Sequence, residues 1–220
     1  MSRWLRQNSL SIVLFGLFVV FLVGQSLTGW RANNEQQREH HEPTLGFGAY
    51  LTTGHFVEAT FENWESEFLQ MASFVLLTIW LVQRGSSESK PLAGDPEKEA
   101  DSRSGSDLER APGPVKRGGW QLVLYENSLG IAFTLLFVLS FLLHALGGAR
   151  AYSAELVAHG RKPVSTAQFV RTSTFWFQSF QNWQSEFVAV ASLVVLTIFL
   201  RQKGSPESKP VAAPDQETGG

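Results

Sequence analysis

Cysteine is absent from the 220 residues of the sequence. Disulfide bonds, thiolate metal sites and cysteine nucleophiles are therefore excluded. The sequence also lacks a strongly basic tract, and its formal net charge is −2, so we expect no nucleic-acid partner. It contains no phosphate-binding glycine loop, nucleophile elbow or HExxH zinc motif. These absences favour a protein that is not an enzyme, and nothing in the sequence predicts a cofactor or a metal site.

Charged residues are missing from four apolar runs. The run at 10–27, LSIVLFGLFVVFLVGQSL, and the run at 129–146 have no charged residue. As helices they would be roughly 27 Å long, close to the hydrocarbon core of about 30 Å in a bilayer. Shorter apolar runs lie at 68–82 and 187–200. We therefore predict an all-α integral membrane protein with four transmembrane helices that lie in the lipid bilayer.

The first apolar run has one rival interpretation. Arg3 and Arg6 precede it, and a basic start followed by an apolar core is also typical of a signal peptide. No small-residue cleavage site follows cleanly, and the matching run at 129–146 is internal and cannot be a leader. We expect the first run to be retained as a membrane anchor.

The chain matches itself without a gap when it is shifted by 119 residues. The match joins 8–91 to 127–210 and includes QRGSSESKP from Gln83 against QKGSPESKP from Gln202. A match of this length predicts a tandem duplication, with two parallel repeats of two spans each. The linker and the tail are rich in Ser, Gly, Pro and charge, which predicts disorder. The expected parts are a first repeat at 1–91, a linker at 92–119, a second repeat at 120–203 and a tail at 204–220.

The positive charges are distributed unequally between the two sides of such a membrane protein. With four spans, twelve of the 18 lysines and arginines fall in the N-terminal arm, the linker and the tail. Because positive residues favour the cytoplasmic side, we expect the linker and both termini to be cytoplasmic.

Two segments on the outer side have the periodicity of amphipathic helices. Apolar residues recur at spacings near three and four between Phe47 and Trp64, and again between Phe169 and Trp183. Ser165 and Gln168 have the spacing of a capping box. We predict two amphipathic helices on the outer surface.

The motif NWESEF at 63–68 returns as NWQSEF at 182–187, each time before an apolar run. One interpretation is a hinge, in which the asparagine and glutamate stabilise the junction between a surface helix and a span. A second is a site for a proton or cation made by Glu67 and Glu186, and a third is a partner interface. The candidate residues are Asn63, Trp64, Ser66, Glu67, Asn182, Trp183, Ser185 and Glu186.

Gln25 and His144 also correspond under the shift, near the outer ends of the first and third runs. A polar residue at this depth usually forms a hydrogen bond with a neighbouring helix. For His144 a proton relay is the alternative.

The stretch GHFVEATFENWESEFLQ at 54–70, followed by LVQRGSSESK, resembles a family of bacterial membrane proteins classed as a domain of unknown function. The resemblance covers both repeats and implies a bacterial inner-membrane protein. It implies no cofactor or substrate. In the second copy, His55 and Glu58 are replaced by Thr174 and Phe177. Any role of His55 is therefore confined to one half of the chain.

Together these observations favour a non-enzymatic protein of the bacterial inner membrane with a structural or partner-interaction role. Its partner would be another membrane protein or a second copy of the chain. The alternative is a small transporter or channel that uses Glu67 and Glu186 to carry a proton or cation.

Overall fold

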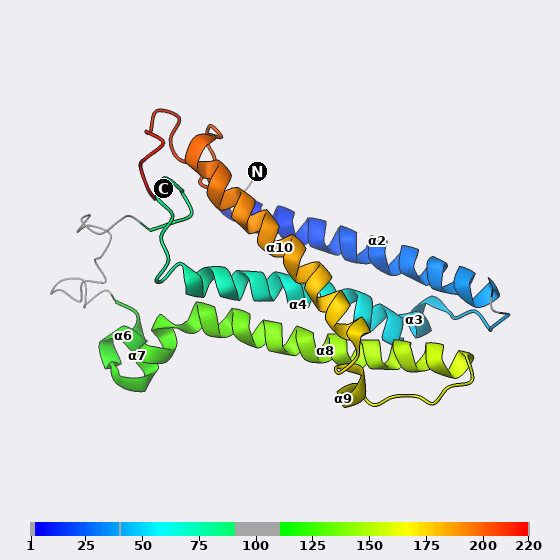
Figure 1. Cartoon of the computed structure of the whole chain (residues 1–220). Helices are drawn as coiled ribbons and strands as arrows, with labels where there is room; N and C mark the ends of the chain where they lie inside the picture. Colours follow the sequence, from blue (N-terminus) through cyan, green and yellow to red (C-terminus); the bar gives the residue numbers. More distant parts are fainter. Residues whose placement is uncertain (1–2, 40, 91–110, 220) are drawn as a thin grey trace. The chain divides into compact units, whose positions relative to one another are not determined.

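The computed structural model describes residues 3–39, 41–90 and 111–219, and its regular elements in these ranges are all helices (Figure 1). This confirms the predicted all-α class. Three helices are long and apolar enough to cross a membrane. They are α2 (Ser9–Glu39), α8 (Ser128–Ala158) and α10 (Ser173–Phe199).

Helix α4 (Gly54–Leu77) contains most of the predicted second span but is not among these three. It ends at Leu77, before the predicted end of that span at residue 82. The physical difference from α10 is charge, because α4 carries four glutamates and α10 carries one. Three membrane-compatible helices are therefore present in the described residues where the sequence predicted four.

The long helices extend well beyond the predicted spans. Helices α2 and α8 are both 31 residues long and continue into the polar segments that follow the apolar runs. In the described residues, the amphipathic segments do not form helices separate from the apolar segments that follow them. Only the short helices α3 (Phe47–Tyr50) and α9 (Thr166–Phe169) form there, and the rest of each amphipathic segment is the start of α4 or α10.

The predicted capping box is confirmed at the start of α9. The Ser165 hydroxyl accepts a hydrogen bond from the Gln168 backbone N–H at 3.3 Å, and the Gln168 side chain accepts one from the Ser165 backbone N–H at 2.8 Å. These bonds satisfy N–H groups that the first turn of a helix leaves without intrahelical partners.

Residues 92–110, most of the predicted disordered linker, lie outside the described residues. Its last part contains α6 (Gly113–Arg117), and α7 (Gly119–Glu126) leads from there into α8. A further short helix, α1 (Arg3–Gln7), precedes α2.

The described part of the tail differs from the expected disorder, since it forms turns with specific hydrogen bonds. Lys209 is 1% exposed, and its ammonium donates to the backbone oxygens of Pro214, Asp215 and Glu217 at 3.3, 3.0 and 3.0 Å. Arg201 forms an ion pair of 2.9 Å with Asp215. Burying the stem of a lysine while its charge meets three carbonyls gives this polar segment a defined structure.

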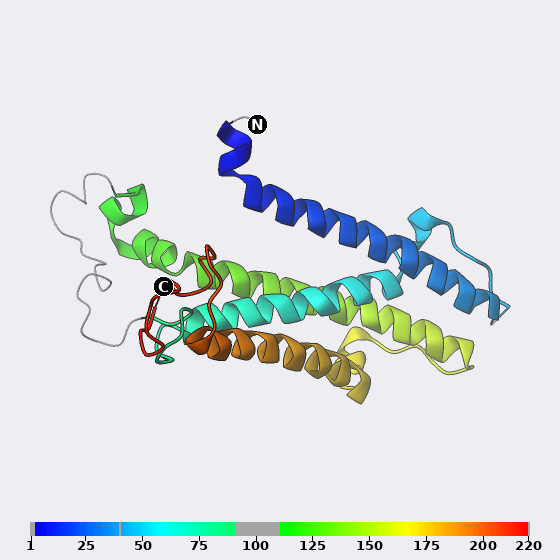
Figure 2. The same ribbon diagram turned by 90° about the horizontal axis from the view of Figure 1, so that it is seen from above.

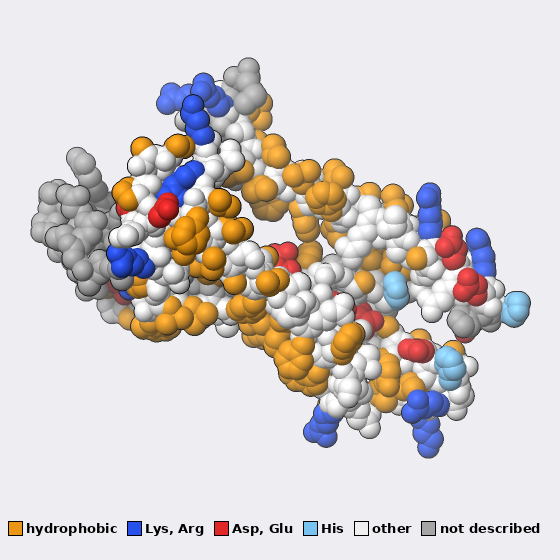
Figure 3. Space-filling view, turned by 45° about the horizontal axis from the view of Figure 1, so that its top comes forward, with side chains coloured by type: hydrophobic (Ala, Val, Ile, Leu, Met, Phe, Trp, Pro, Cys, Tyr) orange, Lys and Arg blue, Asp and Glu red, His pale blue; other side chains and the backbone are white. Residues whose placement is uncertain are grey.

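The chain divides into two compact units, which do not coincide with the predicted repeats because their boundaries fall within α4 and α8. The first unit comprises 1–60 and 143–172, and the second comprises 61–142 and 173–220. In the space-filling view, hydrophobic side chains dominate the surfaces of the long helices, and Lys and Arg gather near helix ends (Figure 3).

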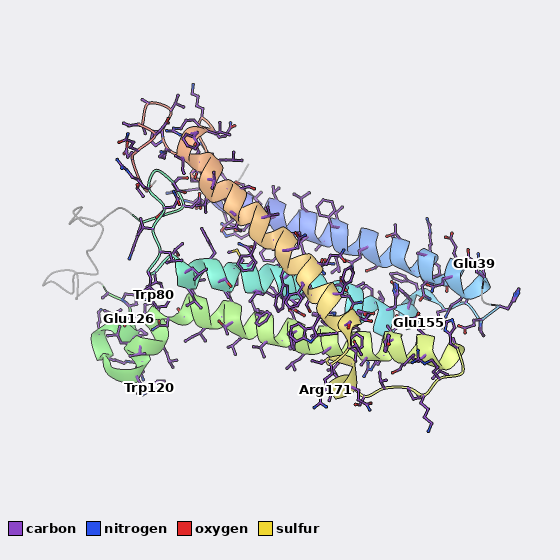
Figure 4. All side chains as sticks on the ribbon, in the orientation of Figure 1. Glu39, Trp80, Trp120, Glu126, Glu155 and Arg171 are labelled. Carbon is purple, nitrogen blue, oxygen red and sulfur yellow. The ribbon has the colours of Figure 1, made fainter. Side chains whose placement is uncertain are left out.

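In the first unit, side chains of α2 form hydrogen bonds with the segment that leads to α3. The Asn34 side chain and the Leu45 backbone form two hydrogen bonds of 2.9 and 2.8 Å. The Trp30 indole donates to the same Leu45 oxygen at 2.6 Å. Tyr50, 1% exposed, lies with its hydroxyl directly over Gly29. Glu39 of α2 and Glu155 of α8 mark the polar ends of their helices (Figure 4).

In the second unit, α10 lies beside α4 (Figure 2), and a hydrogen bond between Trp183 and Glu65 links the two helices. The segment after α4 meets the end of α10 through a hydrogen bond of 3.0 Å between the hydroxyls of Ser86 and Thr197. Trp80, Trp120 and Glu126 all lie at the end of this unit where α7 enters α8 (Figure 4).

Candidate functional site

Helix α4 runs through residues 63–68 without interruption, so the NWESEF motif lies within one helix. Asn63 lies inside the helix and does not cap its start. The Ser66 hydroxyl donates to the Asn63 backbone oxygen at 2.7 Å, and Ser185 repeats this bond with Asn182 at 2.8 Å. Bonds of this kind satisfy the serine hydroxyl within its own helix.

Two of the repeated residues instead connect helices within the second unit. The Asn182 amide donates to Glu62 Oε1 at 2.8 Å, and the Trp183 indole donates to Glu65 Oε1 at 3.0 Å. Glu65 is fully buried. We call Glu62, Glu65, Asn182 and Trp183 the polar seam. It holds α4 against α10 through hydrogen bonds in which the acceptor is a carboxylate, the stronger class of such bonds.

Glu67 and Glu186 do not belong to the polar seam. Glu67 is exposed and Glu186 is partly buried, and the two carboxylates lie close enough for their charges to repel. Trp64, the second residue of the first motif, packs edge to face on Phe61 and Phe68, with centroid distances of 5.1 and 6.4 Å. Residues that lie together in the motif therefore make different contacts in the structure.

Sequence reasoning missed Glu62 and Glu65 because it weighted positions that the two copies share. Under the 119-residue shift, both acids correspond to glutamines, Gln181 and Gln184. This difference between the two copies was the sequence signal that could have identified the two acids. The first copy contributes carboxylate acceptors, and the second contributes the amide and indole donors that meet them.

In the first unit, the residues of the other repeated pair both lie beside α4. Gln25 Nε2 of α2 lies 3.4 Å from the Ala59 backbone oxygen and 3.4 Å from the Thr60 hydroxyl. His144 of α8 is fully buried, and one of its ring nitrogens lies within 4.8 Å of a Glu58 carboxylate oxygen. Gln25 thus forms hydrogen bonds with a neighbouring helix, and His144 lies near a carboxylate of the same helix.

Helices α4 and α8 approach closely around His144. A Cβ atom on Gly147 would lie 2.6 Å from the Glu58 backbone nitrogen, and one on Gly54 would lie 2.7 Å from the Gly147 oxygen. Only residues without a side chain allow backbones to approach to this distance. Gly148 faces the Glu58 carboxylate and the ring of Phe169, which is fully buried.

His55 lies at the start of α4, where its Nδ1 atom is 3.2 Å from the Tyr50 hydroxyl. Loss of water contact lowers the pKa of His55 and raises the pKa of Tyr50. The structure therefore joins His55 to a tyrosine, and it brings Glu58, the other residue that the second copy lacks, to His144.

The long apolar helices, with polar contacts buried between them, define an all-helical protein compatible with a membrane. The chain belongs to the family described as domain of unknown function DUF6766, whose model matches residues 1–220. No curated protein and no solved structure matches the chain.

Proposed function

We propose that the chain is a bacterial inner-membrane protein with a structural or partner-binding role and cytoplasmic termini. The polar seam is the observation that carries this proposal. Its carboxylates are engaged by an amide and an indole from the facing helix. Carboxylates held in this way stabilise a helix pair, whereas a transport pathway needs groups that exchange partners with the transported ion.

Local structure that recurs at the same interval supports a duplication. Both ends of α2 and α8 differ by 119 residues, and so do both ends of α3 and α9. Gly85 and Gly204 have φ values of 87° and 85°, which favour glycine. We therefore propose two repeats of two spans each, with α4 as the fourth span in the position that α10 has in the second copy.

In this arrangement the polar seam joins the second helix of one repeat to the second helix of the other. An apolar contact alone gains little between helices in lipid, because lipid tails are as apolar as the side chains. Hydrogen bonds to these carboxylates, of which Glu65 is fully buried, supply the specificity that fixes which helices pair.

The alternative is a small transporter or channel, and the proximity of Glu67 and Glu186 favours it. Two carboxylates whose charges repel relieve that repulsion by binding a proton or a cation. Both side chains retain access to solvent. This site would be independent of the polar seam.

Reconstitution into liposomes that contain a pH-sensitive dye separates the two proposals. With a structural role, we expect the unsubstituted protein and the double variant Glu67→Gln with Glu186→Gln to match empty liposomes in proton leak. The same double variant should reach the membrane in normal amounts. A proton flux that is present in the unsubstituted protein and absent from the variant would establish the alternative.

The orientation has its own test. A reporter that is active only in the periplasm, fused at Gly105, should be silent if the linker is cytoplasmic. The same reporter fused at His159, in the segment expected outside, serves as the positive control. An active Gly105 fusion would reverse the proposed topology.

A further inference from the structure

His144 is the starting point, because a fully buried imidazole in an apolar helix needs a specific partner. Burying a polar group without compensation costs several kcal/mol, roughly 2–7 depending on the reference state. Ionisable residues at such positions in membrane proteins usually have a function. The structure places the partner on α4, inside the same compact unit.

The candidate partner is the Glu58 carboxylate. One of its oxygens and one ring nitrogen of His144 lie within 4.8 Å of each other, so a small adjustment of the two side chains would bring both atoms to one metal ion. An imidazole nitrogen with a carboxylate oxygen is the ligand combination that zinc and related divalent cations accept. Glu62 follows Glu58 by four residues, so α4 carries both carboxylates on one face by helix register.

The surrounding backbone keeps the two ligand groups in place. A Cβ atom on Gly148 would lie 3.0 Å from Glu58 Oε1 and 2.5 Å from the Phe169 ring. A side chain at this position would therefore push both groups away from His144. Phe169 is itself fully buried. Ligands that are locked by packing are favourable for metal binding, since little freedom is lost when the ion binds.

The first copy shows that the contact between a glycine and an aromatic ring does not itself need this pair. Gly148 and Phe169 correspond under the 119-residue shift to Gly29 and Tyr50, which also pack together. His144 and Glu58, however, correspond to Gln25 and Phe177. The glycine and the aromatic ring are thus present twice, whereas the imidazole and carboxylate occur as a pair once.

We propose that His144 and Glu58 bind a divalent transition-metal cation of the zinc class between α4 and α8. The ring nitrogen and a carboxylate oxygen are the two ligands from the first unit, and further positions on the ion are open to water or another oxygen donor. Binding requires a neutral imidazole and an ionised carboxylate. Metal binding therefore weakens as the pH falls. It also releases a proton when the metal-free pair of His144 and Glu58 holds one.

The test uses the full chain in lipid nanodiscs, with Co²⁺ as a spectroscopic substitute for Zn²⁺. We expect a visible absorption band on titration, and competition by Zn²⁺. His144→Gln and Glu58→Gln should each weaken binding by at least about 10-fold, the smallest effect usually seen even for residues that only support a ligand. The control is Glu155→Gln with His159→Gln, which removes the same two residue types from the exposed end of α8.

A second experiment remains decisive if either ligand variant fails to fold. In a chain where His40, His41, His55 and His159 are replaced by glutamine, His144 is the one remaining histidine. Cu²⁺ bound to this chain should show coupling to an imidazole nitrogen in pulsed electron paramagnetic resonance. Absence of that coupling would overturn the proposal. So would unchanged Co²⁺ affinity in folded His144→Gln protein, with folding verified by circular dichroism.

Discussion

Removal of the Trp183 indole N–H tests whether the polar seam holds α4 and α10 together. Trp183→Phe keeps an aromatic ring but leaves the fully buried Glu65 without the donor that lies 3.0 Å from its Oε1 atom. A hydrogen bond to a charged group contributes roughly 1.5–3 kcal/mol to stability. We expect a loss near the lower end of this range, because such bonds measured in a membrane protein average about 0.6 kcal/mol and reach about 1.7.

The contribution of the pair itself comes from a double-mutant cycle. Glu65→Leu removes the acceptor, and the double variant removes both partners. The sum of the stability losses in the two single variants should therefore exceed the loss in the double variant. The difference, the coupling energy, should be roughly 1–1.5 kcal/mol. Glu65→Gln keeps a carbonyl oxygen as acceptor, so it should cost less than either single change.

Unfolding in mixed micelles with increasing SDS, followed by circular dichroism, measures these free energies. Trp120→Phe is the matched control, because Trp120 is 71% exposed and the same change there should be nearly neutral. A coupling energy within about 0.3 kcal/mol of zero, the usual additivity of independent sites, would refute the structural role of the polar seam.

Two further variants probe the helix approach and the turns at the ends of α4 and α10. Gly147→Ala should destabilise the protein by roughly 1–3 kcal/mol through overpacking against the Glu58 backbone, whereas Gly16→Ala, with open space around it, should be neutral or stabilising in the same SDS titration. Burial raises the pKa of Glu88, and the nearby charge of Glu207 raises it further. Ionisation of Glu88 therefore opposes folding, and the stability of the protein falls as the pH rises through this raised pKa. Glu88→Gln should therefore increase thermal stability at pH 7 and leave it unchanged at pH 3; an equal gain at both values would contradict this explanation.

The helices were predictable where hydrophobicity alone decides the structure. The apolar runs at 10–27 and 129–146 lie inside α2 and α8, because a continuous apolar segment has few alternatives to a helix in lipid. Their extension into polar residues was not predictable from span length, since bilayer thickness limits only the apolar part.

The amphipathic segments show the opposite case. Their helical periodicity indicated helices correctly, but periodicity cannot locate a helix end in the absence of a breaking residue. After Gly54 no proline interrupts the sequence up to Leu77, so one helix contains both the amphipathic part and the apolar part. Asn63 therefore lies within this helix.

Site residues were harder to predict because tertiary packing decides which side chains meet. The motif pointed to Glu67 and Glu186, which repeat, while the hydrogen bonds involve Glu62 and Glu65, which do not. The sequence indicated His144 as a polar residue near a span end. It could not show that Glu58 is the carboxylate beside it, because that proximity depends on the glycine contact between α4 and α8.

The duplication that we propose accounts for contacts at positions where the two copies differ. When equivalent residues of two copies come close, they bring identical charges together, as Glu67 with Glu186 and Glu88 with Glu207 do in the second unit. Such pairs repel. Attraction requires non-equivalent partners, and Glu65 meets Trp183, the counterpart of its neighbour Trp64. Gln184→Glu, which makes the two copies alike at this position, should therefore add charge to α10 without adding a hydrogen-bonded partner, and we expect no gain in stability in the SDS titration.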